Sequence, residues 1–286
     1  MDLGGAIDCY VHAAPDLLPR ARDDLALADE CRKTGLRAAL HRHHFAATAD
    51  RAALARNATG FDLLGAIILN EQVGGLQPAV VDMALRSGVR WIGMPTLSAA
   101  AFRRRLPSGG GHDAVLRLGP GNLTLIDEAG RLRPPASEIL ELAGSASVAV
   151  GLGYGSMAEC MALCRAAAEA RAPALVLTYP DVMGLSDPEV RQLIGQEGAW
   201  LEVCAFTLHP HGIQPHLAAD LRRRTLSWIA EAGPDRVIVS SDGGMAGLPD
   251  PAELLHWCLG WLRDSGLQET QVAAMVRDNP ARLLRL

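Results

Sequence analysis

Short apolar segments recur along the chain, and each is rich in leucine or β-branched side chains. Between most of them lie longer segments with helical periodicity, several of which open with residues that favour a helix start. These start signals are Ser156 with Glu159, Ser186 with Pro188 and Glu189, and Asp250 with Pro251 and Glu253. Such an alternation predicts parallel strands connected by helices. Eight strands are expected, at residues 6–12, 36–40, 63–69, 89–92, 147–150, 174–178, 200–204 and 236–240.

Eight strand and helix units predict an α/β fold of the TIM type, a single (β/α)8 barrel. Because such a barrel usually needs about 250 residues, we assign the 286 residues to one domain, 1–286. The alternative is a doubly wound sheet. It has less support, because no glycine-rich phosphate loop follows an early strand and the glycines at 151–155 lack a later acidic partner.

The alternation is interrupted once, at about 105–135, between the fourth and fifth strands. Three glycines at 109–111 predict a flexible loop, and residues 127–130 have the composition of a turn. We therefore expect an insertion that ends in a small hairpin above the barrel. His112, beside the glycines, is expected to be solvated, although a lid over the site would also lie in such a loop.

Charge and composition narrow the function classes. The net charge is −5 and no basic stripe is present, which argues against a nucleic-acid partner. The sequence has no apolar run of membrane-spanning length and no secretory signal at its start, so we expect a cytoplasmic protein without a membrane partner. Six cysteines without a CxxC pair indicate reduced, buried thiols. The expected partner is a small-molecule substrate, and the composition is compatible with a homo-oligomer.

Lys33 is the only lysine of the chain, and it lies near the end of an amphipathic helix expected at 25–34. A lysine at a helix end is normally solvated. Chemistry that needs a buried lysine, such as a Schiff base or a carbamylated metal bridge, therefore has almost no candidate here.

Polar side chains gather where the predicted strands end, which is where barrels of this kind place their chemistry. Asp8, Tyr10 and His12 alternate along the first strand and should share its inner face. The second strand ends in four consecutive polar residues, of which His41 and His43 share a face and act either as metal ligands or as a charged rim. All three tyrosines of the chain fall at predicted strand ends. The full set is Tyr10, His12, His41, Arg42, His43, His44, Tyr154, Tyr179, Glu202 and Asp242.

Several of these positions form a pattern that resembles the amidohydrolase superfamily, and most closely its small members that open with Asp-x-His-x-His-x-x-Pro-Asp. The resemblance spans nearly the whole chain. It rests on Asp-x-Tyr-x-His at 8–12, Gly-Tyr at 153–154, Thr-Tyr-Pro at 178–180, Ser-Asp at 241–242 and Asp-Asn-Pro-Ala-Arg-Leu-Leu at 278–284.

The resemblance implies one or two divalent metals, held by the His-x-His pair, by histidines on the fifth and sixth strands, and by an aspartate after the eighth. This sequence keeps His12 and Asp242 but has Tyr10, Tyr154 and Tyr179 at the other three positions. A neutral phenol is a poor zinc ligand beside imidazole, so an ordinary binuclear hydrolytic centre is not expected, and the position of Lys33 on a helix argues against a lysine-bridged one. The cofactor expected is one divalent metal, zinc first, at His12, His43 and Asp242, or none.

The function predicted is that of an amidohydrolase-like enzyme with a remodelled metal site, acting on a small polar molecule by hydrolysis or by metal-independent acid/base chemistry. We assign catalysis to Tyr10, Tyr154, Tyr179, His41 and Asp242, with the phenols donating to a developing oxyanion. Substrate binding is assigned to Arg42, His44 and Glu202. The alternatives are a metal-free lyase, cyclase or isomerase, and a binding protein without turnover.

Overall fold

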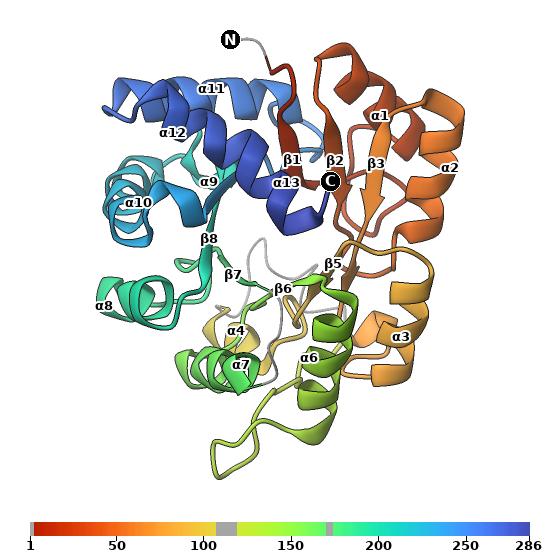
Figure 1. The fold of residues 1–286 in the computed structure, drawn as a ribbon, viewed down its shortest axis with the longest axis vertical. Helices are drawn as coiled ribbons and strands as arrows, with labels where there is room; N and C mark the ends of the chain where they lie inside the picture. The colour runs from red at the N-terminus through yellow and green to blue at the C-terminus, as the bar shows by residue number, and fades with distance from the viewer. Residues whose placement is uncertain (1–2, 107–118, 170–173) are drawn as a thin grey trace.

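The computed structural model describes residues 3–106, 119–169 and 174–286 of the protein. Its centre is a set of parallel strands in two sheets, with the orders β1-β2-β3 and β4-β5-β6-β7-β8-β9 (Figure 1). The strands are β1 (Ile7–Val11), β2 (Ala38–His41), β3 (Asp62–Gly65), β4 (Ile67–Ile68), β5 (Trp91–Gly93), β6 (Ala149–Gly151), β7 (Leu175–Thr178), β8 (Trp200–Cys204) and β9 (Val237–Ser240).

The first join between the sheets lies within the predicted third strand, because only Ala66 separates β3 from β4. The hydroxyl of Thr48 accepts the N–H of Ala66 at 2.8 Å and so takes the place of a strand partner. Gly65 lies against the start of the following helix, where an added Cβ would come within 2.5 Å of the Ala49 Cα. The segment predicted at 63–69 is therefore one barrel strand with an interruption.

The second join brings the last strand against the first. The N–H of Asp242 donates to the carbonyl of Tyr10 at 2.8 Å, and the N–H of His12 donates to the carbonyl of Gly243 at 2.9 Å. With β3 and β4 counted as one strand, eight strands close into a barrel. The predicted (β/α)8 fold is confirmed.

Helices follow the strands and enclose the barrel (Figure 1). Capping boxes open two of them as predicted: the N–H of Ser156 donates to Glu159 at 2.7 Å, and that of Ser186 to Glu189 at 2.8 Å. The helices are α1 (Asp24–Lys33), α2 (Ala49–Thr59), η1 (Glu71–Val73), α3 (Pro78–Arg86), α4 (Ala100–Arg105), α6 (Pro134–Ala146), α7 (Met157–Glu169), α8 (Asp187–Arg191), η2 (Gln192–Gln196), α9 (Ala205–Leu208), α10 (Ala218–Ala232), η3 (Pro234–Arg236), α11 (Pro251–Asp264), α12 (Glu269–Ala273), η4 (Ala274–Asp278) and α13 (Asn279–Leu284).

The outer surface bears on two of the compositional predictions. Lys33 closes α1, has a side chain 67% exposed and pairs with Asp29 at 2.6 Å, so it is solvated as predicted. In the part of the chain that the structure describes, no helix combines the length and the apolar character needed to cross a membrane.

The barrel interior is apolar toward the amino ends of the strands. One buried side chain from most strands points inward there, and α13 closes the end with Leu283 and Leu284. The opposite faces of the strands pack against the surrounding helices in a second, larger core. The interior layer includes Ile7, Leu40, Leu64, Trp91, Ala149, Val176 and Ile238.

A bulge in β1 changes the predicted direction of one side chain. Asp8 pairs with Ala39 of β2 and Val11 pairs with His41, so three steps along β1 match two along β2. Residues paired in a parallel sheet share a face, and Ala39 lies between Ala38 and Leu40 of the interior layer, so Ala39 and its partner Asp8 face outward. The prediction that Asp8 lies on one inward line with Tyr10 and His12 is therefore wrong, because the extra residue shifts the alternation.

The insertion between β5 and β6 is described only in part. The predicted glycine loop at 109–111 and His112 lie outside the described residues. The hairpin predicted after them is present, since Ile126 and Leu132 form an antiparallel bridge and the N–H of Gly130 donates to the carbonyl of Asp127 at 3.0 Å. The carboxylate of Glu159 accepts the N–H of Leu125 at 2.8 Å and ties the insertion to the start of α7.

Candidate active site

A cavity of about 380 Å³ opens at the carboxyl ends of the barrel strands. Its volume falls in the range of sites for small molecules. The polar side chains that line it include His12, His44, Tyr154, Tyr179 and Asp242, all predicted from the sequence. Much of the remaining wall is apolar, formed by Leu18, Leu97, Phe102, Leu106, Val182, Phe206, Ile213 and Met245.

Asp242 is the carboxylate of this cavity. Its Oδ2 accepts a hydrogen bond from the hydroxyl of Tyr179, and its Oδ1 lies 2.9 Å from the Nε2 of His12. That short contact is not aligned as a hydrogen bond, so the buried Oδ1 has no hydrogen-bond partner, and neither has the Nδ1 of His12. Buried polar atoms are rarely left unpaired. Both atoms are therefore free to bind a molecule in the cavity.

Burial sets the protonation of this pair. It raises the pKa of Asp242 to about 6, against the opposing effect of the Tyr179 hydrogen bond. Burial also lowers the pKa of His12 well below its usual value. At neutral pH the carboxyl group is thus mainly ionised and the imidazole is neutral. A carboxylate with this pKa can take a proton from a bound molecule and return it.

The backbone is strained where it presents Asp242 and Tyr179. Both residues adopt left-handed conformations: Asp242, two residues after the end of β9, has φ 51°, and Tyr179, directly after β7, has φ 56°. Two residues later, Gly244 has φ +117° and lies so close to β1 that an added Cβ would come within 2.1 Å of the His12 carbonyl oxygen. These conformations turn the chain over the barrel mouth and bring the two side chains together.

The three tyrosines form a chain of neighbouring rings. Tyr154 and Tyr179 line the cavity with centroids 6.5 Å apart, and Tyr10 lies 6.4 Å from Tyr179. The side chain of Tyr10 also acts on Tyr154, since it lowers the pKa of that phenol against the larger effect of burial. Burial raises the pKa of all three phenols well above the usual value, so each remains a neutral donor at physiological pH.

Arg42 and Glu202, predicted to bind substrate, are paired with each other below the cavity. Two hydrogen bonds of 2.7 and 2.8 Å join them across the barrel from β2 to β8. The guanidinium lies 3.7 Å from the centroid of Trp91 and 4.2 Å from that of Tyr10. Neither member of the pair lines the cavity. Their contacts make them part of the barrel interior rather than of a surface that touches a ligand.

His41, predicted to be catalytic, faces away from the cavity. Arg42 takes the inward direction, so the residues on either side of it point outward. The Nε2 of His41 accepts the N–H of Ala13 at 3.3 Å, and its Nδ1 lies 2.8 Å from Asp24 of α1. The Nε2 of His41 thus holds the loop that follows β1, whereas its Nδ1 makes only an ion-pair contact with Asp24, without an aligned hydrogen bond.

His43, predicted to bind metal, is engaged in the same way. Its Nε2 donates to the carbonyl of Pro15 at 3.1 Å, and its Nδ1 accepts the N–H of Phe45 at 3.0 Å. His44 alone of the three histidines reaches the cavity. Its Nδ1 lies 3.0 Å from the hydroxyl of Thr96, and burial lowers its pKa to about 3, so it is neutral.

The side chains present do not fit the predicted metal centre. No group of three or more His, Cys, Asp or Glu that could hold a metal ion occurs among the residues that the structure describes. Of the predicted set, His12 and Asp242 line the cavity, whereas His43 has both nitrogens engaged elsewhere. The other candidates in the wall are His44, whose Nδ1 is engaged with Thr96, and neutral phenols, which are weak ligands for zinc. We therefore assign no chemical step to a metal.

Four polar residues of the cavity wall are absent from the set predicted from the sequence: Arg20, Arg105, Thr207 and Gln214. Arg20 lies in the loop after β1, with a side chain only 2% exposed, and its Nε donates to Asp16 at 2.6 Å. The spacing of four residues between Asp16 and Arg20 was the one available signal, and it is equally common on protein surfaces.

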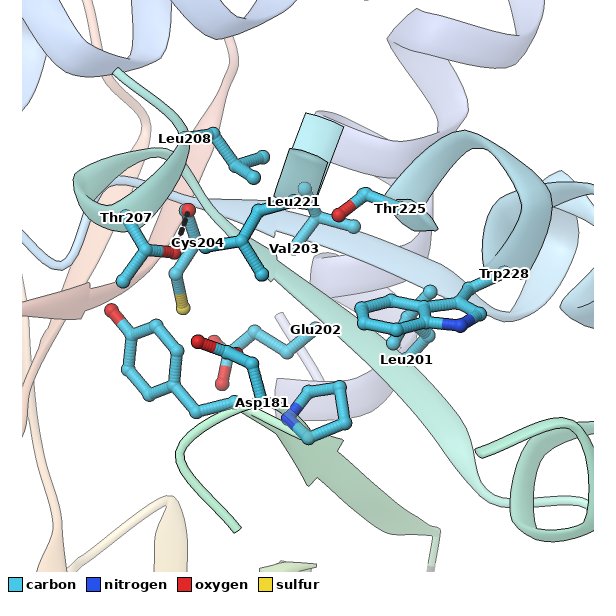
Figure 2. Close-up of a pocket in the computed structure, with 12 residues that line it drawn as sticks. Asp181, Leu201, Glu202, Val203, Cys204, Thr207, Leu208, Leu221, Thr225 and Trp228 are labelled. Carbon is cyan, nitrogen blue, oxygen red and sulfur yellow. Dashed lines mark hydrogen bonds between the residues drawn. The ribbon is translucent and has the colours of Figure 1, made fainter. Parts of the chain in front are cut away.

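A second, smaller cavity adjoins the first between β8 and α10 (Figure 2). Its volume is about 20 Å³, enough for one water molecule. Figure 2 shows Asp181, Cys204 and Thr207 around it, and Tyr179 lines both cavities. Burial raises the pKa of Asp181. This space is too small for a substrate.

Comparison with known proteins gives a family and a set of structural neighbours. A model described as a family of unknown function (DUF6282) matches residues 5–202. No curated protein matches the chain.

Solved structures share the barrel over nearly its full length. A probable 2-pyrone-4,6-dicarboxylic acid hydrolase from Acinetobacter baumannii, with citric acid bound, is 12% identical, with 99% of this chain and 100% of that chain covered and a TM-score of 0.64. An organophosphorus hydrolase from Deinococcus radiodurans is 14% identical (99% and 93% covered, TM-score 0.61). A mutant PTE-like lactonase from the same organism is 15% identical (99% and 96% covered, TM-score 0.59). At these identities the likeness establishes a common fold.

Proposed function

Because the chain belongs to the family of unknown function DUF6282, whose description assigns no reaction, we propose a function from its own side chains. The proposed activity is hydrolysis of a small ester or lactone without a metal, with Asp242 as the general base. The observation that carries it is the unpaired Oδ1 of Asp242 beside His12 in the cavity wall.

The arrangement supports one proton transfer in each direction. Asp242 removes a proton from water while the water oxygen forms a bond to the carbonyl carbon, and the carbonyl π electrons move onto oxygen. When the tetrahedral species collapses, the carbonyl re-forms and the bond to the leaving oxygen breaks. That oxygen takes the proton from Asp242. The products are an acid and an alcohol, which are one molecule when the substrate is a lactone.

Neighbouring groups have separate parts in this scheme. Tyr179 holds the Oδ2 of Asp242, which leaves Oδ1 for the water. His12 orients that water through a ring nitrogen. Tyr154 donates to the carbonyl oxygen as it becomes negative, a role suited to a phenol that stays protonated. The printed names of the structural neighbours, two hydrolases and a lactonase, agree with this reaction class.

The test is a hydrolysis assay of the purified protein with γ-lactones, δ-lactones and nitrophenyl esters, before and after dialysis against a chelator. We expect activity that survives chelation. The Asp242→Asn variant should lose about 10²–10⁴-fold in kcat, the usual contribution of a general base. Asp82→Asn, which alters an exposed carboxylate on α3, is the matched control and should keep full activity.

Two results would contradict the proposal. If a chelator removes the activity and added zinc restores it, the reaction depends on a metal. If the protein binds these compounds but hydrolyses none of them, the alternative of a binding protein without turnover is supported.

A further inference from the structure

Arg20 carries a polar group that the proposed reaction does not use. Its side chain lines the cavity and is 2% exposed, and its Nε is paired with Asp16. Its Nη2 is buried and has no hydrogen-bond partner. An unpaired guanidinium N–H in a closed environment is costly, since hydrogen bonds to charged groups are the strong ones. The geometry leaves this N–H for a molecule in the cavity.

The positive charge of Arg20 affects the pKa of three other polar residues of the cavity wall. It helps to lower the pKa of His12, of His44 and of Asp242, although burial has the largest effect on each group. Arg20 therefore lies near all three. An anion bound at its Nη2 would be held beside the group that we assign as general base.

The surroundings limit the charge and shape of that anion. The cavity wall contains Arg20 and Arg105 as cations and Asp242 as an anion, and Asp16 already neutralises part of Arg20. These two cations and two carboxylates already sum to zero, so a ligand with a single negative charge is repelled less than a dianion such as phosphate, and the unpaired Nη2 of Arg20 is where that charge can be held. The apolar wall favours a ligand with a hydrocarbon body.

We propose that the cavity binds a small monocarboxylate with an apolar body, whose carboxylate pairs with the Nη2 of Arg20. The inference rests on the proposed function, because it takes this cavity as the substrate site. It adds the chemical class of the substrate: an ester or lactone that also carries a carboxylate.

Calorimetry can test the pairing without any turnover. The probes are benzoate, phenylacetate and hexanoate, each compared with its neutral amide. For the parent we expect at least one carboxylate to bind about tenfold or more tightly than its amide, as a charge-assisted hydrogen bond predicts. Arg20→Met should abolish that preference and leave amide binding unchanged.

Arg22→Met is the matched control. Arg22 is two residues further along the same loop, is paired with Glu30 and Asp250, and is absent from the cavity wall. It should keep the preference. If Arg20→Met fails to fold because Asp16 loses its partner, the double variant Arg20→Met/Asp16→Asn should abolish the preference, and Asp16→Asn alone should keep it.

The outcomes separate the two proposals. Carboxylate preference that depends on Arg20, in a protein that hydrolyses nothing, supports the binding inference and contradicts the proposed reaction. Hydrolysis of neutral lactones without any carboxylate preference overturns the inference and leaves the reaction standing. A preference that survives removal of Arg20 also overturns it, and assigns the anion to another cation.

Discussion

Tyr154 illustrates what a single side chain contributes at the cavity wall. It stands at a position where the resemblance implies a metal-binding histidine, and its buried phenol stays neutral. An imidazole there could donate or accept, and could bind a metal, whereas a phenol at neutral pH is a fixed donor. Contacts of its ring with Phe102 and Tyr179, at 5.3 and 6.5 Å between centroids, keep it in place.

The Tyr154→Phe variant should therefore lower kcat by about 10²–10³-fold, the usual cost of removing one oxyanion donor, while the ring still fills its space. The measurement is steady-state hydrolysis of the best ester or lactone found. Tyr10→Phe is the informative companion, because Tyr10 contacts Tyr154 but lies outside the cavity wall. It should cost less. Equal activity of Tyr154→Phe and the parent would mean that the phenol only fills space.

The β1 strand shows how far sequence patterns extend at the scale of an element. The apolar segments predicted where β1 lies, and the residues at its end predicted its polar side chains. The count of eight strands predicted that β9 closes the barrel against β1. The bulge between Asp8 and Val11 was not predicted, because it depends on pairing with another strand. The same limit applies to β2, where His41 faces outward because Arg42 finds Glu202 on the far side of the barrel. Arg20 was missed because the path of its loop is set by tertiary contacts.

Asp8 links β1 to β9 and makes this join sensitive to pH. Its Oδ1 accepts the N–H groups of Tyr10 and Ser241 at 3.1 and 2.9 Å. Its Oδ2 is buried without a partner, and burial raises the pKa of the carboxyl to about 7. Between about pH 4 and pH 7 the folded chain holds a proton here that the unfolded chain releases. Stability from this group is therefore lost as pH rises through that window.

The Asp8→Asn variant should remove this dependence, since an amide oxygen can accept the same two N–H groups without ionising. Between pH 5 and pH 8, the free energy of unfolding of the parent should fall by about 2–3 kcal/mol more than that of the variant. Urea unfolding at a series of pH values measures it. Asp62→Asn, which changes an exposed aspartate at the start of β3, should behave like the parent. Parallel curves for parent and Asp8→Asn would contradict the assignment.

At the scale of the whole molecule, the pair of Arg42 and Glu202 joins opposite sides of the barrel. Glu202 also accepts the hydroxyls of Thr178 at 2.6 Å and Ser240 at 2.7 Å, so four strands meet at one carboxylate. Such a pair is costly to bury, but removing one partner is costlier, because it leaves an uncompensated charge.

Arg42→Met should therefore destabilise the protein by about 3–5 kcal/mol, the range for breaking a buried pair. The double variant Arg42→Met/Glu202→Gln should recover part of that loss, because no charge remains and the amide can still accept a hydrogen bond. Urea unfolding gives both values. Arg131→Met, in an exposed pair with Asp127, is the control and should change the free energy of unfolding by less than about 1 kcal/mol. A double variant less stable than Arg42→Met would contradict the argument.

Helix α13 closes the barrel at the amino ends of the strands, with Leu283 and Leu284 inside and Asn279 donating to the carbonyls of Pro234 and Val237. The cavity opens at the opposite end of the same barrel. A surface, tag or fused domain attached at Leu286 is therefore held on the side away from the mouth. Protein molecules attached to a support at Leu286 would therefore have the mouth of the cavity directed toward the solution.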